Sequence, residues 1–263
     1  PRRAPGPQEV EIRVKAAGLN FKDVLIALGV LPAPTDPSMT FGQEAAGIVT
    51  RVGREVEDVR VGDRVMCAGH SCLAEHVLMP RRVVAPIPRT LGFQQAAGVP
   101  VAFTTAWIAL RHAANLKRGE RILIHSAAGG VGMAAMQIAL YLGAEVWVTA
   151  GSEEKRELLI GMGAKGAANS RTREFGEVFR RQLGERPFAV ILNALAGELL
   201  EESLSLLAPQ GRFLELGLRD ILQNWRLGLA LFAEGGSFHA VQAGAEHPAY
   251  REAWAEVVQL LEQ

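Results

Sequence analysis

Residues 121–144 contain the pattern that most constrains the fold of this chain. The apolar run RILIH (121–125) is followed by the glycine-rich segment SAAGGVG (126–132) and by the apolar helical segment MAAMQIALYLGA (133–144). A strand that ends in a glycine-rich turn and leads into a helix directs free backbone N–H groups and the positive end of the helix dipole toward a diphosphate. The segment therefore predicts a dinucleotide-binding unit.

The glycine turn is a variant of the usual fingerprint, because Ala127 stands where the first glycine is expected. Its context supports it, since the apolar run EVWVTA (145–150) has the place of the second strand, which ends ~20 residues after the turn. An alternative is a turn whose glycines only let the helix and the strand pack closely. The predicted cofactor-binding residues of the turn are Ala128, Gly129, Gly130, Val131 and Gly132.

The end of the second strand indicates which nicotinamide cofactor fits. An NAD site has an acidic residue there, whereas a 2′-phosphate is bound by hydroxyl groups and cations. Here the strand runs into Gly151 and Ser152, with Lys155 three residues later, and the Asn-Ser-Arg-Thr segment adds Arg171. We therefore predict NADPH, with Lys155 and Arg171 on its phosphate, and the alternative for both is a solvated surface charge.

The order of the apolar runs predicts two lobes in an α/β protein. Short β-like runs separated by turn residues fill the first part of the chain, at 9–17, 45–52, 61–66 and 73–79. From about Leu91, helical stretches alternate with runs at 121–125, 145–150, 188–193 and 212–217, which favours a parallel sheet with crossover helices. The length of 263 residues is enough for more than one core.

Composition excludes several classes of partner. The 28 basic and 28 acidic residues balance, so the charge gives no reason to expect nucleic acid or an anionic membrane. No apolar run reaches the ~20 residues of a membrane span, and the N-terminus has no signal-peptide core, so a cytoplasmic protein is expected. The two cysteines, Cys67 and Cys72, are expected to be reduced thiols.

The chain resembles the enoyl reductase domains of modular polyketide synthases and animal-type fatty acid synthases over nearly its whole length. The segments that carry the resemblance are AAGLNFKDVLIALG (16–29), VGDRVM (61–66), HSAAGGVGMAAMQIA (125–139), AGSEEKRELL (150–159), 191–217 and FHAV (238–241). These domains are zinc-free members of the medium-chain dehydrogenase/reductase superfamily. The resemblance implies a partly open, β-rich GroES-like substrate lobe at 1–96 and a doubly wound Rossmann lobe at 97–241. It also implies a helix within 242–263 that leads back to the first lobe, with segments at both ends of the domain missing.

The same resemblance implies the reaction and its partners. The expected activity is NADPH-dependent reduction of the α,β double bond of an enoyl thioester on an acyl carrier protein, with ketoreductase and dehydratase domains as neighbours. Site residues implied by it are Asn20 and Phe21 on the nicotinamide side, Thr104 and Thr105 near the cofactor, and Asn193, Leu195, Leu216 and Gly217 beside the nicotinamide. Turn capping by Asn20 and helix starting by the two threonines are the alternatives.

A zinc ion is not expected. The zinc-dependent relatives have a cysteine and a histidine where this chain has Asn20 and Gln43, and neither amide is a suitable zinc ligand. The four clustered cysteines of their second zinc site are absent from the sequence as well.

Three family positions associated with proton delivery depart from the pattern. Leu31 stands in place of a tyrosine, Leu218 in place of a lysine, and Gly244 lies near the place of an aspartate. Asn20, Phe21, Leu31 and Leu218 are therefore the positions expected to shape the chemistry. The departures leave three hypotheses: ordinary enoyl reduction, hydride transfer in which the enolate takes a proton from solvent or closes a ring such as a cyclopropane, and a degenerate domain without turnover.

Overall fold

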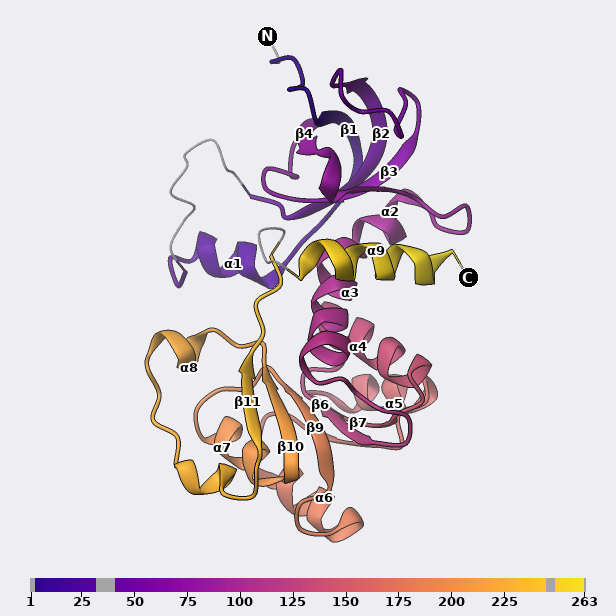
Figure 1. The fold of residues 1–263 in the computed structure, drawn as a ribbon. Coiled ribbons are helices and arrows are strands. Elements are labelled where there is room, and N and C mark those ends of the chain that lie inside the picture. Colours follow the sequence, from indigo (N-terminus) through magenta and orange to yellow (C-terminus); the bar gives the residue numbers. More distant parts are fainter. Residues whose placement is uncertain (1–2, 32–40, 245–248, 263) are drawn as a thin grey trace. The chain divides into compact units, whose positions relative to one another are not determined.

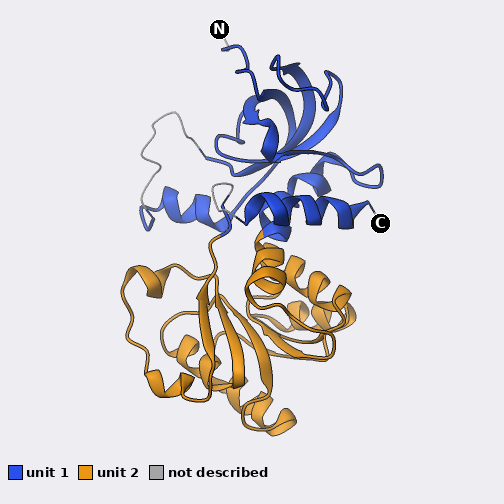
Figure 2. Ribbon diagram, viewed as in Figure 1, with its two compact units in different colours: residues 1–104, 243–263 blue, residues 105–242 orange. Residues whose placement is uncertain are grey.

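A computed structural model describes residues 3–31, 41–244 and 249–262, and the chain divides into two compact units (Figure 2). Unit 1 contains residues 1–104 and 243–263, and unit 2 contains residues 105–242. No helix within the three described ranges is long and apolar enough to cross a membrane.

Unit 1 contains a five-stranded antiparallel sheet in the order β4-β1-β2-β3-β5 (Figure 1). Its strands are β1 (Glu9–Gly18), β2 (Glu44–Val52), β3 (Arg64–Ala68), β4 (His76–Pro80) and β5 (Val84–Pro86). Its helical elements are α1 (Phe21–Ala27), the 3-10 turn η1 (Arg81–Val83), α2 (Phe93–Ala97), the start of α3 (Pro100–Trp107) and α9 (Tyr250–Leu261). Thus α9, at the far end of the sequence, belongs to the same unit as β1.

Unit 2 contains a six-stranded parallel sheet in the order β11-β10-β9-β6-β7-β8. Its strands are β6 (Arg121–Ile124), β7 (Glu145–Ala150), β8 (Gly166–Asn169), β9 (Phe188–Asn193), β10 (Leu207–Glu215) and β11 (Ser237–Ala240). Its helical elements are the π-helix η2 (Ile108–Ala113), α4 (Gly130–Tyr141), α5 (Glu153–Gly161), α6 (Glu174–Leu183), α7 (Glu198–Ser205), α8 (Arg219–Leu222) and the 3-10 turn η3 (Leu229–Phe232). The predicted α/β class, with a doubly wound parallel sheet in one unit and a β-rich lobe as the other, is confirmed.

Some strand limits differ from those predicted. The strand expected at 61–66 begins at Arg64, because Gly62 adopts a left-handed φ of 99° and the Asp63 carboxylate accepts the Arg60 N–H. The strand expected at 73–79 occupies 76–80, and the one expected at 212–217 occupies 207–215.

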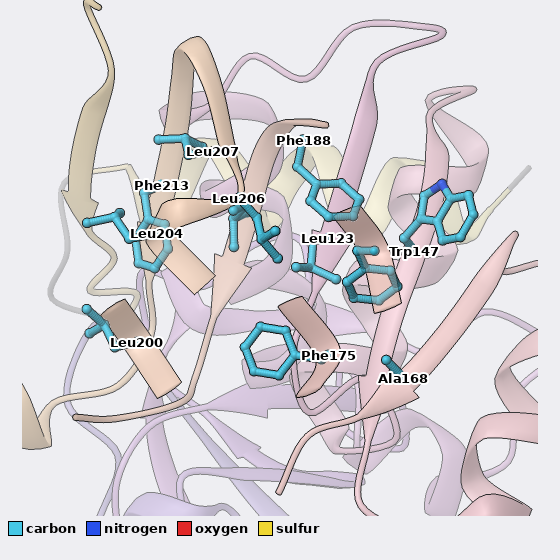
Figure 3. Packing of buried hydrophobic residues seen from close by; sticks show 12 residues of the cluster. Leu123, Trp147, Ala168, Phe175, Phe188, Leu200, Leu204, Leu206, Leu207 and Phe213 are labelled. Atoms are coloured by element: carbon cyan, nitrogen blue, oxygen red, sulfur yellow. The ribbon is translucent and has the colours of Figure 1, made fainter. Parts of the chain in front are cut away.

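One face of the unit 2 sheet packs against α6 and α7 through a large apolar cluster (Figure 3). The strands contribute alternate residues such as Leu123, Ile191 and Phe213, and the helices contribute residues such as Phe175 and Leu204. Figure 3 shows Leu123, Phe213, Phe175 and Leu204 among the side chains of this cluster. Since a parallel sheet is covered on both faces, its strands are continuous apolar runs, which is why most of them are visible in the sequence.

Replacing Phe188 tests how much this cluster contributes to the free energy of unfolding. The Phe188 side chain is fully buried, and its ring meets the Phe179 ring edge-on at a centroid distance of 5.4 Å. We expect Phe188→Ala to lower the free energy of unfolding by about 3–5 kcal/mol, because a cavity replaces a buried ring. Urea unfolding measures the change. Tyr141→Ala, which removes an aromatic side chain that is 60% exposed, serves as the control and should cost less than ~1 kcal/mol.

Candidate functional site

The site in unit 2 lies where the order of the strands reverses. Strands β6, β7 and β8 succeed one another on one side, and β9 returns to the other side of β6. The turns that follow β6 and β9 therefore leave neighbouring strands at the same edge of the sheet and diverge. Ligands of open parallel sheets bind outside the carboxyl ends of the strands at such a point.

The glycine turn after β6 leads directly into α4. Ser126 adopts a left-handed φ of 51°, and the Ala127 N–H donates to Thr149 O at 3.1 Å, which ties the turn to β7. Helix α4 begins at Gly130, and the N–H groups of its first turn have no partner inside the helix. Twelve residues of aligned peptide dipoles add positive potential there.

Two glycines of this turn have different surroundings. A Cβ on Gly132 would lie 2.5 Å from Ser126 O and 2.6 Å from the Ala127 Cα, so Gly132 allows α4 to pack against the turn. A Cβ on Gly130 would meet no atom within 4 Å. Gly132 thus serves the fold, whereas Gly130 leaves open space in front of the helix, as the approach of a diphosphate requires.

A cationic side chain, that of Arg171, lies beside the end of β7. A Cβ on Gly151 would lie 2.9 Å from Nε of Arg171, so this guanidinium lies directly beside the strand end. Ser152 caps α5 by accepting the Lys155 N–H at 3.5 Å, and the Lys155 side chain is exposed. In contrast, the Arg156 guanidinium donates to Ala150 O at 3.2 Å. Of the residues predicted for a 2′-phosphate, Arg171 thus lies beside Gly151, and Ser152 caps the helix that carries Lys155.

The ends of β9 and β10 are joined by a buried polar network. Nδ2 of Asn193 donates to Leu195 O at 2.8 Å and to Oε2 of Glu215 at 2.6 Å, while Oδ1 accepts the Leu195 N–H at 3.1 Å. Oε1 of Glu215 accepts the Gly217 N–H at 2.6 Å. The Leu216 N–H donates to Asn193 O at 2.9 Å. The predicted residues Asn193, Leu195, Leu216 and Gly217 thus form one connected group.

The buried His125, which follows β6, is hydrogen-bonded to residues of two other elements. Its ring nitrogens lie 2.8 Å from Thr149 Oγ1 and 2.7 Å from Ser203 Oγ, and its ring meets the Phe175 ring edge-on. Complete burial lowers the pKa of His125 to about 3, so the ring is neutral. It therefore connects β6, β7 and α7 without introducing a charge.

Asn20 in unit 1 is held by a buried carboxyl group. Nδ2 of Asn20 donates to Oε1 of Glu44 at 3.0 Å, and Oε2 of Glu44 accepts the Val101 N–H at 2.8 Å. Burial raises the pKa of Glu44, and the two hydrogen bonds oppose that rise. The buried Asp23 accepts the N–H groups of Asn20 and Gly42. Because the nitrogen of the Asn20 amide is occupied, its orientation is fixed.

The other predicted residues have mixed environments. Phe21 is the first residue of α1 and is 74% exposed, whereas Leu31, after α1, is only 7% exposed. Thr104 on α3 is buried and Thr105 is half-buried. Leu218 is half-buried and caps α8.

The side chains present do not suit a zinc ion. No three His, Cys, Asp or Glu side chains lie together as a ligand set among the residues that the structure describes. The Asn20 nitrogen is a donor to Glu44, and Cys67 and Cys72 are buried. The neighbouring Cys67 thiol, together with burial, raises the pKa of Cys72, which disfavours the thiolate that a metal needs.

Comparison with known proteins identifies the family. The model "Alcohol dehydrogenase GroES-like domain" matches residues 6–89, and "Zinc-binding dehydrogenase" matches residues 130–263. The phthioceranic/hydroxyphthioceranic acid synthase of Mycobacterium tuberculosis is 43% identical over 248 residues, which cover 93% of this chain and 12% of that protein. A highly reducing polyketide synthase of Didymella fabae is 43% identical over 237 residues, which cover 89% of this chain and 12% of that protein. The chain thus spans about an eighth of the length of these relatives.

Three solved structures resemble the whole chain. CurK enoyl reductase is 36% identical, with a TM-score of 0.86 over 99% of this chain and 81% of that one. The CurF ER cyclopropanase of the curacin A biosynthetic pathway is 30% identical, with a TM-score of 0.87 over 100% and 82%. The Escherichia coli quinone oxidoreductase complexed with NADPH is 28% identical, with a TM-score of 0.87 over 100% and 81%.

The parallel sheet with a glycine turn at its strand-order reversal, together with the GroES-like unit, defines the fold of an oxidoreductase of the medium-chain dehydrogenase/reductase type. The chain belongs to the medium-chain dehydrogenase/reductase superfamily, in its polyketide synthase enoyl reductase branch.

Several polar residues of the site were not predicted from the sequence. These are Glu44, Asp23, Glu215 and His125, and all four are buried. Glu44 and Asp23 are hydrogen-bonded to Asn20 in unit 1, and Glu215 is hydrogen-bonded to Asn193 in unit 2. His125 directly precedes the glycine turn. The sequence does contain a signal for three of them. Glu44, His125 and Glu215 each stand at one end of an apolar run, where a strand with a purely structural role would have another apolar residue.

The two glycines of the turn allow a matched test of folding. We expect Gly132→Ala to lower the free energy of unfolding by about 1–3 kcal/mol, since its Cβ would collide with backbone atoms. Gly130→Ala should leave stability unchanged or raise it by up to about 1 kcal/mol, because the site is open and alanine lowers the entropy of the unfolded chain. Urea unfolding of the two variants without ligand gives both values, and equal losses would contradict the assignment.

Proposed function

We propose that this chain catalyses NADPH-dependent reduction of the α,β double bond of an enoyl thioester carried by an acyl carrier protein, by hydride transfer to Cβ without a metal ion. The observation that carries the proposal is the open glycine turn at the strand-order reversal, in a chain of the polyketide synthase enoyl reductase branch. Neighbouring ketoreductase and dehydratase domains would supply the substrate. The cytoplasmic location stays a prediction.

The chain's own residues would bind the cofactor along the carboxyl edge of the unit 2 sheet. The first turn of α4, with Ala128, Gly129, Gly130, Val131 and Gly132, would hold the diphosphate by backbone N–H groups and the helix dipole. Ser152, Lys155 and Arg171 beside Gly151 would hold the 2′-phosphate. The turns after β9 and β10 would contact the nicotinamide, which supplies a hydride when bound.

Reduction also needs groups that stabilise negative charge on the thioester oxygen. Fixed backbone N–H groups in a site that excludes water stabilise such charge strongly. The glycine turn and segment 191–195 are the proposed sources of such groups, and the roles of Asn20 and Phe21 stay predictions from the family resemblance. With Leu31, Leu218 and Gly244 at the three departing positions, the proton at Cα would come from solvent in the ordinary outcome.

A second outcome has its own support in the 30% identity to the CurF ER cyclopropanase. After hydride addition at Cβ, the electron pair of the enolate could form a bond from Cα to Cγ while a leaving group departs from Cγ with its own electron pair. The product would then be a cyclopropane, formed without a proton donor. The three departures at Leu31, Leu218 and Gly244 are compatible with both outcomes.

Product analysis tests the proposed reaction. With NADPH and a crotonyl thioester, we expect a butyryl thioester, detected by mass spectrometry with one hydride from the 4-position of the cofactor. An enoyl thioester with a leaving group at Cγ distinguishes a saturated product from a ring. The assay is run with and without EDTA, and a loss of activity with EDTA that excess zinc restores would contradict the metal-free reaction. NADPH binding without any product would indicate a degenerate domain.

The phosphate site predicts the cofactor preference. We expect NADPH to bind at least about tenfold more tightly than NADH, or about 1.4 kcal/mol. Arg171→Ala should reduce this preference, because it removes the cation beside Gly151. Arg156→Ala is the matched control and should leave the preference unchanged, since its guanidinium is bonded to Ala150 O. Fluorescence titration with both cofactors measures the ratio, and equal affinities in the unmodified protein would rule out the preference.

A further inference from the structure

Glu215 is a buried acid at the carboxyl edge of the unit 2 sheet. It is the last residue of β10, it is 2% exposed, and it pairs in register with Asn193 of β9 and Ala240 of β11. An apolar side chain would pack there at no electrostatic cost, whereas a buried carboxyl group is costly unless it is hydrogen-bonded. Its hydrogen bonds indicate how the carboxyl group is used at this edge of the sheet.

Both oxygens of Glu215 are used by the two turns that leave β9 and β10. Oε2 accepts from Asn193, whose amide is bonded on both sides to the backbone of Leu195, and Oε1 accepts the Gly217 N–H. Residues 193–197 and 216–218 are therefore connected through one carboxylate. Within unit 2, this carboxylate links the turns that the proposed function places against the nicotinamide.

A second carboxylate, that of Asp220, binds the turn after β9. Oδ2 of Asp220 on α8 accepts the Gly197 N–H at 2.5 Å, and Oδ1 is buried with no hydrogen-bond partner among the described residues. The Arg219 guanidinium lies 3.8 Å from that Oδ1. From α8 the Asp220 charge acts on Glu215, whereas β9 and β11 contribute the uncharged Asn193 and Ala240.

We propose that Glu215 is a positioning residue, which acts through Asn193 and Gly217 to hold the turns after β9 and β10 in the conformation that receives the nicotinamide end of the cofactor. This inference rests on the proposed function. Glu215 itself does not touch the reacting atoms, so its effect is expected on the nicotinamide half of the ligand and not on the adenine half.

The charge of Glu215 changes near neutral pH. Burial raises the pKa of Glu215 to about 7, with a further contribution from the Asp220 charge, while the hydrogen bonds from Asn193 and Gly217 oppose the rise. Above pH 7 the carboxylate is the stronger acceptor for both turns, and below it the protonated acid is the weaker one. The hold on the turns should therefore loosen as the pH falls through 7.

The experiment compares two ligands that share one half. NADPH and 2′-phospho-ADP-ribose carry the same phosphates. The dissociation constant of 2′-phospho-ADP-ribose divided by that of NADPH therefore reports only what the nicotinamide end contributes to binding. Protonation of the 2′-phosphate affects both constants equally and does not change this ratio. We expect Glu215→Gln to reduce this ratio about tenfold, the scale of one charge-assisted hydrogen bond, with the affinity for 2′-phospho-ADP-ribose unchanged. The ratio should also fall from pH 8.5 to pH 6 in the unmodified protein and stay constant in the variant.

Glu202→Gln provides the matched control. Glu202 is a buried acid of α7 that pairs with Arg173 and Arg180, away from the two turns, and its replacement should leave the ratio unchanged. Equal loss of affinity for both ligands in Glu215→Gln, or no loss, would overturn the proposal. If that variant does not fold, a constant ratio across pH in the unmodified protein would overturn it as well. Failure of the unmodified protein to bind either ligand would instead remove the proposed function, on which the inference rests.

Discussion

The reversal of strand order between β6 and β9 is the constraint on which the organisation of unit 2 depends. Because β9 returns to the open side of β6, the turns after these two strands diverge at one edge of the sheet. The polar groups of the candidate site in this unit lie along that edge: the first turn of α4, the end of β7 beside Arg171, and the network of Asn193 and Glu215. The apolar cluster under α6 and α7 supports the edge, because it packs the strands that end there against two helices.

The same device recurs in both units. In unit 1 a buried glutamate, Glu44, holds the Asn20 amide with one oxygen and a backbone N–H with the other. In unit 2 Glu215 holds the Asn193 amide and the Gly217 N–H in the same way. Burial raises the pKa of both acids. A carboxylate that accepts two donors fixes an amide side chain without competing for its oxygen, and each unit uses this arrangement next to residues of the family pattern.

The sequence predicts this architecture well where a single chemical pattern decides the structure. The buried runs at 145–150 and 188–193 match β7 and β9, because a parallel strand covered on both faces is continuously apolar. The sequence does not predict β8 or β11, since segments such as Gly-Ala-Ala-Asn are recognised only by the neighbour they pair with. The turn residues of the site are readable from glycine and charge, whereas the acids that hold Asn20 and Asn193 depend on register between strands distant in sequence.

Overall similarity does not determine which product the site would form. The CurK enoyl reductase and the CurF ER cyclopropanase resemble this chain almost equally in fold, with TM-scores of 0.86 and 0.87. The backbone alone therefore does not distinguish between these two kinds of enzyme. Backbone similarity thus leaves the outcome to the side chains and to the substrate. At the three departing positions, Leu31 is buried, Leu218 is a half-buried aliphatic cap of α8, and Gly244 has no side chain, so none can donate a proton. In the proposed reaction, water and an electrophilic carbon within the substrate would then compete for the enolate. The chemistry of the substrate at Cγ, more than any residue of this chain, would decide between reduction and ring closure.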